Sequence, residues 1–381
     1  MSEHLPVLQV IVPLLAAPFV AFLRGRELAW WLTLVITGVT FAMSLTLYAH
    51  VQDTGETLIY QMGGWAAPLG IVYVIDAASA LVLPIVSGIG FIVTLAARYL
   101  VGAEIDGRDH PLFYTAWLLT IAGMLGQITT GDAFNIFVFL EISSLSAYAL
   151  VAMGAGRDRR ALPAAFNYLI LGTVGATFYV IGLGLLYMLT GTLNLADLSV
   201  RLAEVEATRA VYTAMAFIAL GLFLKMALFP LHFWLVPAYS FAPSAVSALM
   251  AATATKVSVY VLVRLLFGVF GVSFFGVDSG VGLVLLTLGI TGAFVGTLAA
   301  IVETDLKKLF AQSSIAQLGY MAIGIGLFTP AGLAAAFIHL FNHAPMKGAL
   351  FLAIGTIAAQ AGRASMTTIE GAGRQIPMTM T

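Results

Sequence analysis

The stretch LFLKMALFPLHFWLVPAYSFAPSAVSALMAATATK, residues 222–256, decides the fold. It places Lys225 in an apolar run that meets Pro230 five residues later, and a second lysine, Lys256, in the next apolar run. Proline removes a backbone donor and clashes with the preceding turn, so the helix is expected to break there. A charge at the bilayer centre costs at least about 2.5–3.5 kcal/mol, so two lysines around a broken helix predict an ion or proton path.

The composition of the whole chain is that of a membrane protein. Its 381 residues are 61% hydrophobic and 9% charged, whereas soluble domains are about 45–50% apolar and about 25% charged. A net charge of −1 gives no support for a nucleic-acid partner. The chain contains no cysteine, which excludes disulfides, thiolate metal sites and cysteine nucleophiles.

Apolar runs of about 20 residues predict an all-α polytopic membrane protein with about eleven transmembrane helices. Runs of this length fit helices, because barrel strands would alternate in polarity. The first run follows no basic signal-peptide region and is expected to be retained as a span. The expected spans are residues 5–23, 28–50, 72–97, 111–128, 132–153, 163–189, 210–238 (broken at Pro230), 243–270, 281–302, 309–328 and 331–358.

Basic residues between the spans predict the orientation. Only Arg201 and Arg209 lie in loops on the side of the N-terminus. Because positive loops stay inside, the N-terminus is expected outside. The loops on the other side hold Arg24, Arg26, Arg98, Arg108, Arg157, Arg159, Arg160, Lys307, Lys308, Arg363 and Arg374.

Glu141 and Lys225 are expected to form a functional pair. Glu141 is about ten residues into its span, and thus near mid-depth at about 1.5 Å per residue. A lone buried carboxylate would be protonated, whereas a neighbouring lysine keeps it charged. Such a pair titrates as a unit, so opening it would change the proton affinity of both groups. A static salt bridge between two helices is the alternative, at a cost in lipid.

The eleventh span carries His339, His343 and Lys347 at intervals of four, which places them along one helical face. Pro345 lies among them, so local distortion of this face is expected. Zinc is disfavoured because no further ligand set accompanies the histidines. A proton relay fits better, since a histidine titrates near neutral pH. Lys256 would then connect the Glu141–Lys225 pair to this face.

Three further polar residues have a secondary or structural reading. Asp132 is expected to be an N-cap, with a role at the mouth of an ion path as the alternative. Arg264 is expected to pair locally or to extend towards the membrane surface, and a functional role is less favoured. His232 follows the break at Pro230 and could gate the path or satisfy freed backbone groups.

Other classes of function lack their motifs. The chain has no P-loop, so it is not itself an ATP-driven pump. No nucleophile–base set or cofactor motif indicates a conventional enzyme, and neither a metal nor an organic cofactor is expected.

Three motifs resemble one known family. The sequence KMALFPLHFWLVPAYSFAPSAVSALM resembles the KxxxxPxHxWLPDAYxxAPxPVSAxL signature of antiporter-like subunits. GDAFNIFVFLEISSLSAYAL matches the fifth span of that family, and HLFNHAPMKGALFLAIG matches its HxxxHxxxKxxLFL span. These subunits occur in complex I, in Mrp-type Na⁺/H⁺ antiporters and in membrane-bound hydrogenases. The chain looks most like the D subunit of Mrp-type antiporters, with the complex I chains M and N as runners-up.

The resemblance implies two inverted five-helix repeats, each with a broken helix. It divides the chain into three N-terminal helices (1–110), a first repeat (111–270) and an incomplete second repeat (281–381). It also implies a proton path along Glu141, Lys225, Lys256, His339, His343 and Lys347.

The chain departs from the family pattern at four places. Pro237 replaces the loop carboxylate, Ala245 replaces the second proline, and Asn167 stands where many relatives carry a basic residue. Relatives also continue for about three further spans, so the chain is expected to be a C-terminally truncated fragment. The alternative is that the exit half-channel is absent or supplied by another subunit.

We therefore expect a subunit that translocates protons and monovalent cations in a multisubunit Na⁺/H⁺ or K⁺/H⁺ antiporter of a bacterial inner membrane. Its partners would be other membrane subunits, H⁺, Na⁺ or K⁺ and the lipid bilayer. The alternative is a proton-pumping subunit of an NADH-quinone oxidoreductase or a membrane-bound hydrogenase. A purely structural scaffold is a third hypothesis, which retained activity after Glu141→Gln and Lys225→Ala would favour.

Overall fold

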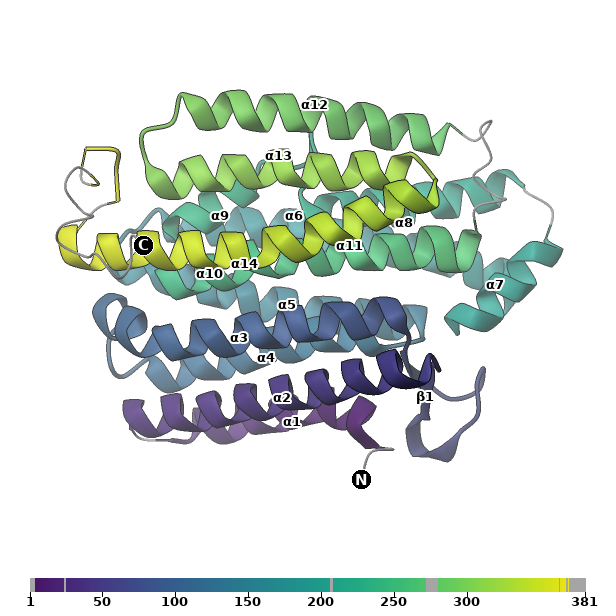
Figure 1. The fold of residues 1–381 in the computed structure, drawn as a ribbon, viewed down its shortest axis with the longest axis horizontal. Helices are drawn as coiled ribbons and strands as arrows, with labels where there is room; N and C mark the ends of the chain where they lie inside the picture. The colour runs from purple at the N-terminus through teal and green to yellow at the C-terminus, as the bar shows by residue number, and fades with distance from the viewer. Residues whose placement is uncertain are drawn as a thin grey trace.

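Long, nearly parallel helices form an elongated bundle with a two-stranded hairpin at one end (Figure 1). The computed structural model describes residues 4–23, 25–205, 208–271, 280–362, 364–367 and 369. The elements are α1 (Leu5–Ala21), α2 (Arg26–Thr54), β1 (Leu58–Gln61), β2 (Val72–Ile75), α3 (Ala77–Glu104), α4 (His110–Thr129), α5 (Ala133–Ala152), α6 (Ala161–Thr190), α7 (Leu195–Glu204), α8 (Arg209–Met226), α9 (Leu235–Phe241), α10 (Ser244–Ala252), α11 (Ala254–Leu265), α12 (Val281–Ile301), α13 (Leu306–Gly326) and α14 (Pro330–Ala361).

The predicted all-α polytopic fold is confirmed. Eight helical segments of the described chain are long and apolar enough to cross a membrane. The helices α1, α13 and α14 occupy the other three predicted segments. Arg24, Arg363 and Arg374, which entered the orientation argument, lie outside the described residues, as does the final segment 370–381.

Two elements at the same end of the bundle differ from the prediction. The third span was expected from residue 72, but residues 72–75 form β2, which pairs antiparallel with β1, and α3 begins only at Ala77. The strand β2 is short and directly precedes α3, so in the sequence its apolar residues look like the beginning of the span. The amphipathic helix α7 was also not predicted; it buries Leu195, Leu198 and Leu202.

The break in the seventh span lies earlier than predicted. α8 ends at Met226, and Ala227 has a left-handed backbone with φ of 57°. The helix thus stops before Pro230, and the chain resumes helical structure at Leu235 in α9. Trp234 donates its indole N–H to the carbonyl of Leu224 at 2.9 Å, which satisfies one carbonyl of the last turn.

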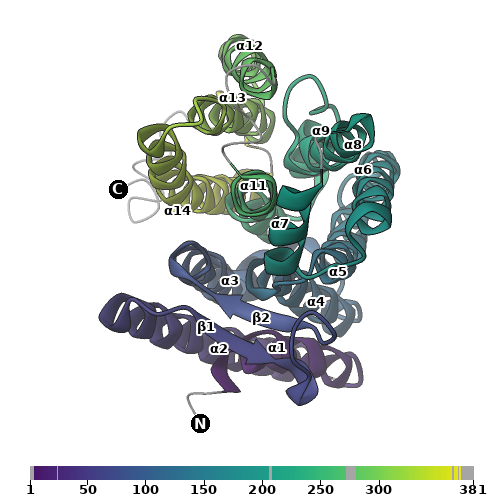
Figure 2. The same ribbon diagram turned by 90° about the vertical axis from the view of Figure 1, so that its right-hand side faces the viewer.

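The eighth span, expected to be one helix, is broken too. Thr253 separates α10 from α11 with non-helical backbone angles (φ −125°, ψ −54°). The span then ends in a turn of π-helix, Leu266–Phe270. In an 18-residue window of this span, 94% of the residues are buried, and Figure 2 shows α11 near the centre of the bundle. The broken span is therefore the most buried of these eight segments.

The two ends of the bundle differ in secondary structure and in their content of basic residues. One end, called the hairpin end, carries β1, β2 and α7 (right in Figure 1, facing the viewer in Figure 2). The opposite end, called the basic end, carries the connections after α3, α5 and α12 (left in Figure 1). These connections hold Arg108, Arg157, Arg159 and Arg160, with Lys307 and Lys308 in the first turn of α13.

Candidate functional site

Lys225 and Glu141 meet inside the bundle. Lys225 is the next-to-last residue of α8, and its Nζ lies 3.2 Å from Oε1 of Glu141 on α5. The lysine side chain is 5% exposed and the glutamate side chain 21%. The structure thus brings together the pair that the sequence suggested. The lysine is buried, and the carboxylate is partly exposed at the surface of the bundle.

Two further side chains of α5 hold the ammonium of Lys225. Its Nζ donates to the hydroxyl of Ser144 at 2.9 Å and lies 3.5 Å from the hydroxyl of Tyr148. Sequence reasoning did not single out either residue. The available signal was their spacing, since they follow Glu141 by three and seven residues and so share its helical face.

A stack of aromatic rings ties this site to the loop after α8. Tyr148 contacts the edge of Tyr168 on α6, and Tyr168 stacks on Trp234 at 4.2 Å with an interplanar angle of 4°. The same Trp234 binds the carbonyl end of α8. The position of Lys225 therefore depends on Trp234 through both the helix end and the ring stack.

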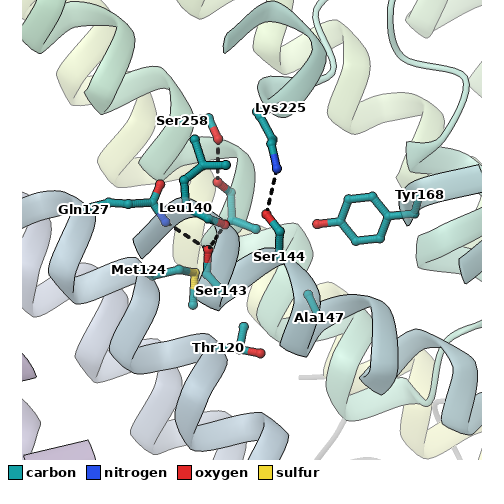
Figure 3. Close-up of a pocket in the computed structure, with 11 residues that line it drawn as sticks. Thr120, Met124, Gln127, Leu140, Ser143, Ser144, Ala147, Tyr168, Lys225 and Ser258 are labelled. Atoms are coloured by element: carbon teal, nitrogen blue, oxygen red, sulfur yellow. Dashed lines mark hydrogen bonds between the residues drawn. The ribbon is translucent and has the colours of Figure 1, made fainter. Parts of the chain in front are cut away.

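A small polar cavity lies beside Lys225 (Figure 3). Its volume is about 30 Å³, so it has room for water. Gln127 of α4 donates its amide to the hydroxyl of Ser143 at 2.9 Å on one wall. Ser258 of α11, two residues after Lys256, also lines the cavity. Hydroxyl and amide groups in this number can hold water, so the cavity joins Lys225 to the helix that carries Lys256.

Lys256 lies at the break of the eighth span. Its side chain is buried, and its Nζ donates to the carbonyl of Ala251 and lies 3.5 Å from the hydroxyl of Thr255. The break at Thr253 frees carbonyl groups that a continuous helix would use. A buried ammonium needs such an acceptor, so the break and the lysine satisfy each other.

His339, His343 and Lys347 line one face of α14, as the spacing predicted. The two imidazole rings are parallel, with centroids 5.8 Å apart. Lys347 is fully buried and donates to the carbonyl of Phe310 on α13 at 2.8 Å. Both ring nitrogens of His343 are buried without a hydrogen-bond partner. The helix continues through Pro345, so the expected distortion does not interrupt it.

The α14 face lies close to Lys256. Gly348, next to Lys347 on α14, lies against the end of α10 before the break: a Cβ on this glycine would be 3.6 Å from Cβ of Ala252. The structure therefore brings the face of α14 against the helix break that carries Lys256.

His232 and Pro230 lie in the loop between α8 and α9. The His232 ring is half-buried and stacks with Phe229 and Phe233, at centroid distances of 5.4 and 4.9 Å. Nδ1 of this histidine has no hydrogen-bond partner, whereas the imidazole has a hydrogen bond to the backbone of Pro230.

The two remaining candidates lie at the hairpin end. Asp132 caps α5 by accepting the amide of Asn135 at 2.7 Å, and burial raises its pKa above the usual value. Arg264 pairs with Asp76, the N-cap of α3. Burial alone would raise the pKa of Asp76, but Arg264 and Ser79 together hold it below the usual value. Among the described residues, no group of three or more His, Asp or Glu could hold a metal ion.

Comparison with known sequences identifies relatives over the whole chain. The family model described as NADH:quinone oxidoreductase/Mrp antiporter, TM, matches residues 130–381. NADH-quinone oxidoreductase subunit N of Desulforudis audaxviator is 41% identical over the full chain and 75% of its own length. The D subunit of the Na⁺/H⁺ antiporter of Alkalihalophilus pseudofirmus is 30% identical over 97% of this chain and 73% of its own length. The chain thus spans about three quarters of these relatives.

Two solved complexes contain a chain of the same fold. A chain of the membrane-bound sulfane sulfur reductase, an archaeal respiratory membrane complex, matches with a TM-score of 0.89 and 31% identity, covering 96% of this chain and 73% of that chain. A chain of the Mrp complex from Dietzia matches with a TM-score of 0.85 and 30% identity, covering 96% of this chain and 66% of that one.

Proposed function

Since the chain belongs to the NADH:quinone oxidoreductase/Mrp antiporter family of membrane subunits, we propose that it translocates protons within a multisubunit membrane complex. Its relatives are subunits of such complexes, so its partners are other membrane subunits. One observation carries the proposal: Lys225 is bound to Glu141 in a nearly closed interior and faces a polar cavity. Buried ionisable groups beside a polar cavity are typical of proton relays in membranes.

The geometry supports a sequence of short proton transfers. Glu141 and Lys225 share their charge, so separating them changes the proton affinity of each. The cavity beside Lys225 is lined by residues of α11, and Lys256, on the same helix, is the next proposed carrier of the proton. From Lys256 the path continues to His343, whose free ring nitrogens can accept and donate a proton, and then to Lys347. His339 extends this face, and each transfer changes the charge that its neighbours experience.

Secondary residues act at the margins of this path. We place Pro230 and His232 at a gate, since they lie in the loop that ends the helix of Lys225. Asp132 and Arg264 lie at the hairpin end, where they shape the mouth of the path. The proposal retains the division into three N-terminal helices, a first repeat and part of a second repeat.

The driving reaction is proposed as Na⁺/H⁺ or K⁺/H⁺ exchange in a bacterial inner membrane, with the N-terminus outside. A redox-driven proton pump is the second candidate. Relatives of both kinds support the two candidates comparably, since an N subunit of an NADH-quinone oxidoreductase is 41% identical and a D subunit of an Na⁺/H⁺ antiporter is 30% identical to this chain. Both use the same buried groups, so the difference lies in what drives the complex.

The test is ΔpH formation in everted vesicles that carry the whole complex with Lys225→Ala. Arg108→Ala is the matched control, since it also removes a cation, but one whose side chain is 92% exposed at the basic end. Loss of proton movement in an assembled Lys225→Ala complex, with the control active, would support the path. Unchanged movement with Lys225→Ala and with Glu141→Gln would reduce this chain to a scaffold.

The same vesicles distinguish the driving reactions. A wild-type complex that dissipates ΔpH on addition of Na⁺ or K⁺ is an antiporter. A complex that ignores these cations but acidifies the vesicles on addition of NADH belongs to the redox-driven class. A response to a different electron donor would indicate the hydrogenase-like type of complex.

A further inference from the structure

A buried carboxylate at the basic end lies outside the proposed path. Glu104 is the last residue of α3, and its side chain is 3% exposed. Its oxygens accept the amide of Ser244 at 2.5 Å and the hydroxyl of Ser244 at 2.7 Å. Ser244 is the first residue of α10, so Glu104 satisfies a free amide at the positive end of that helix. Sequence reasoning passed over Glu104, which resembled an ordinary charge at the end of a span.

Arg157 connects this carboxylate to a second helix. Its Nη1 lies 2.7 Å from Oε1 of Glu104. Its Nη2 donates to the carbonyls of Ala358 and Gly362 at 2.9 and 2.8 Å, at the carbonyl end of α14. A cation stabilises that end of a helix as an anion stabilises the other end. The ion pair therefore joins the start of α10 to the end of α14. The sequence analysis had counted Arg157 only as a basic loop residue.

The two joined helices lead to the two buried lysines. α10 runs from Ser244 to the break beside Lys256, and α14 contains Lys347. The helices also contact along their length. A Cβ on Gly355 would lie 2.7 Å from Cβ of Ser244, and a Cβ on Gly348 would lie 3.6 Å from Cβ of Ala252. The ion pair thus closes one end of a seam whose other end lies beside the lysines.

A polar cavity gives water access to this ion pair. The cavity has a volume of about 580 Å³ and is lined in part by Glu104, Arg157 and Lys307. Lys307 donates to the carbonyl of Ala242, in the turn before α10. The carboxylate of the pair is thus buried, while its arginine faces a cavity at the basic end.

We propose that Glu104 and Arg157 are positioning residues that hold α10 against α14 and so fix the separation of Lys256 from Lys347. The inference rests on the proposed function for its consequence, which is the rate of transfer between the two lysines. The contact itself can be measured without transport. Without the ion pair, a buried amide and two carbonyl groups lose their partners, and the seam loosens from the basic end.

The absence of cysteine makes the seam directly measurable. Disulfides need a Cβ separation of about 3.5–4.5 Å, and the pair Ala252→Cys with Gly348→Cys meets this at 3.6 Å. Oxidation by a membrane-permeable oxidant in the assembled complex gives the rate of closure. We expect Glu104→Gln to slow disulfide formation by about tenfold, because it removes the charge-assisted bond.

Asp158→Asn is the matched control. It breaks the ion pair of Asp158 with Arg160, which also lies at the basic end but is more exposed, and should leave the rate of disulfide formation unchanged. Arg157→Lys tests the other partner, since lysine keeps the charge but loses the forked geometry. It should slow disulfide formation as well, and it serves if the Glu104→Gln complex fails to assemble.

Transport is the second readout. In the reduced double-cysteine background, Glu104→Gln should lower the rate of ΔpH formation and shift its pH profile. Closing the disulfide should restore part of that rate, because the covalent bond replaces the positioning. Disulfide formation at the control rate in both Glu104→Gln and Arg157→Lys would overturn the proposal. Slower disulfide formation with no transport in any complex, wild type included, would refute the proposed function but not the positioning.

Discussion

The ammonium of Lys225 lies at the carbonyl end of α8, beside Glu141, Ser144 and Tyr148. A cation at this end of a helix is favourable. The ammonium has three N–H donors, and the hydroxyls of Ser144 and Tyr148 accept those that Glu141 leaves free. The polar surroundings of this lysine are small and specific. Conservative substitutions near Lys225 should therefore affect proton translocation more than they affect the stability of the fold.

Gln127→Leu tests the polar cavity beside Lys225. Leucine fills nearly the same space but removes the amide that binds Ser143. A water in the cavity would lose one of the two to four partners that it needs. Loss of one net hydrogen bond, about 1–1.5 kcal/mol, should slow ΔpH formation about tenfold. Met124→Leu is the control, since it changes an apolar wall of the same cavity. Equal rates in the two variants would mean that cavity water carries no proton.

Asp76→Asn tests the ion pair at the hairpin end. The folded-state pKa of Asp76 is lowered, so the pair stabilises the protein above the unfolded pKa of about 3.9 and loses this effect as pH falls through the folded pKa. The variant should lose roughly 1–3 kcal/mol of the free energy of unfolding at pH 7, which a lower thermal midpoint in detergent would show. This difference should persist to about pH 5 and narrow only below about pH 4.

Arg264→Gln should reproduce the effect of Asp76→Asn, and the double variant should cost less than the sum of the two. Asp197→Asn is the comparison at the same end, because its partner Arg201 is largely exposed. A difference that vanished already at pH 6, or additive effects of the two variants, would show that the stabilisation does not come from this pair.

At the scale of elements, the predicted helices were recovered because their apolar runs exceed the thickness of the membrane core. The break in the seventh span was predicted, although not its residue, and the break in the eighth span was not predicted. Proline at 230 signalled a break, but α8 ends already at Met226, and the indole of Trp234 binds the carbonyl of Leu224 in its last turn. Nothing local marks Thr253, whose break depends on a lysine that binds the freed carbonyl of Ala251. Tertiary partners, rather than propensity, decide where these helices stop.

Trp234→Phe tests the end of α8. Phenylalanine keeps a ring against Tyr168 but loses the N–H that binds the carbonyl of Leu224. An unsatisfied buried carbonyl costs about 1–3 kcal/mol, so the last turn, with Lys225, should loosen. We expect a lower thermal midpoint and several-fold slower ΔpH formation. Trp31→Phe, on an exposed position of α2, should change neither. Equal behaviour of the two variants would remove Trp234 from the positioning of Lys225.

At the scale of the whole molecule, the orientation makes a simple prediction. Val200 on α7 is exposed at the hairpin end, and Arg159 is exposed at the basic end. The basic end is expected inside, because positive loops are retained there. In right-side-out vesicles, a membrane-impermeant maleimide should label Val200→Cys directly and Arg159→Cys only after permeabilisation. Labelling in the reverse order would invert the topology.

The sequence predicts which charged residues form the candidate site, but not how far apart they lie. Lone charges in apolar spans are visible in the sequence, and Glu141, Lys225 and Lys256 could be found in this way. Their distances to one another could not, because α5, α8 and α11 meet only in the folded bundle. Ser144 and Tyr148 are ordinary residues until a lysine lies beside them. Glu104 and Arg157 look like solvated charges until α10 and α14 converge on them.

The glycines between α10 and α14 limit how this part of the molecule can move. At Gly355 and Gly348 the two helices approach each other closely, with little side-chain bulk between them at these two positions. Closely packed helices of this kind move past one another by shear, in small steps. A working cycle would then proceed by small shear movements rather than by opening about a hinge, and Lys256 and Lys347 would keep nearly the same separation throughout it.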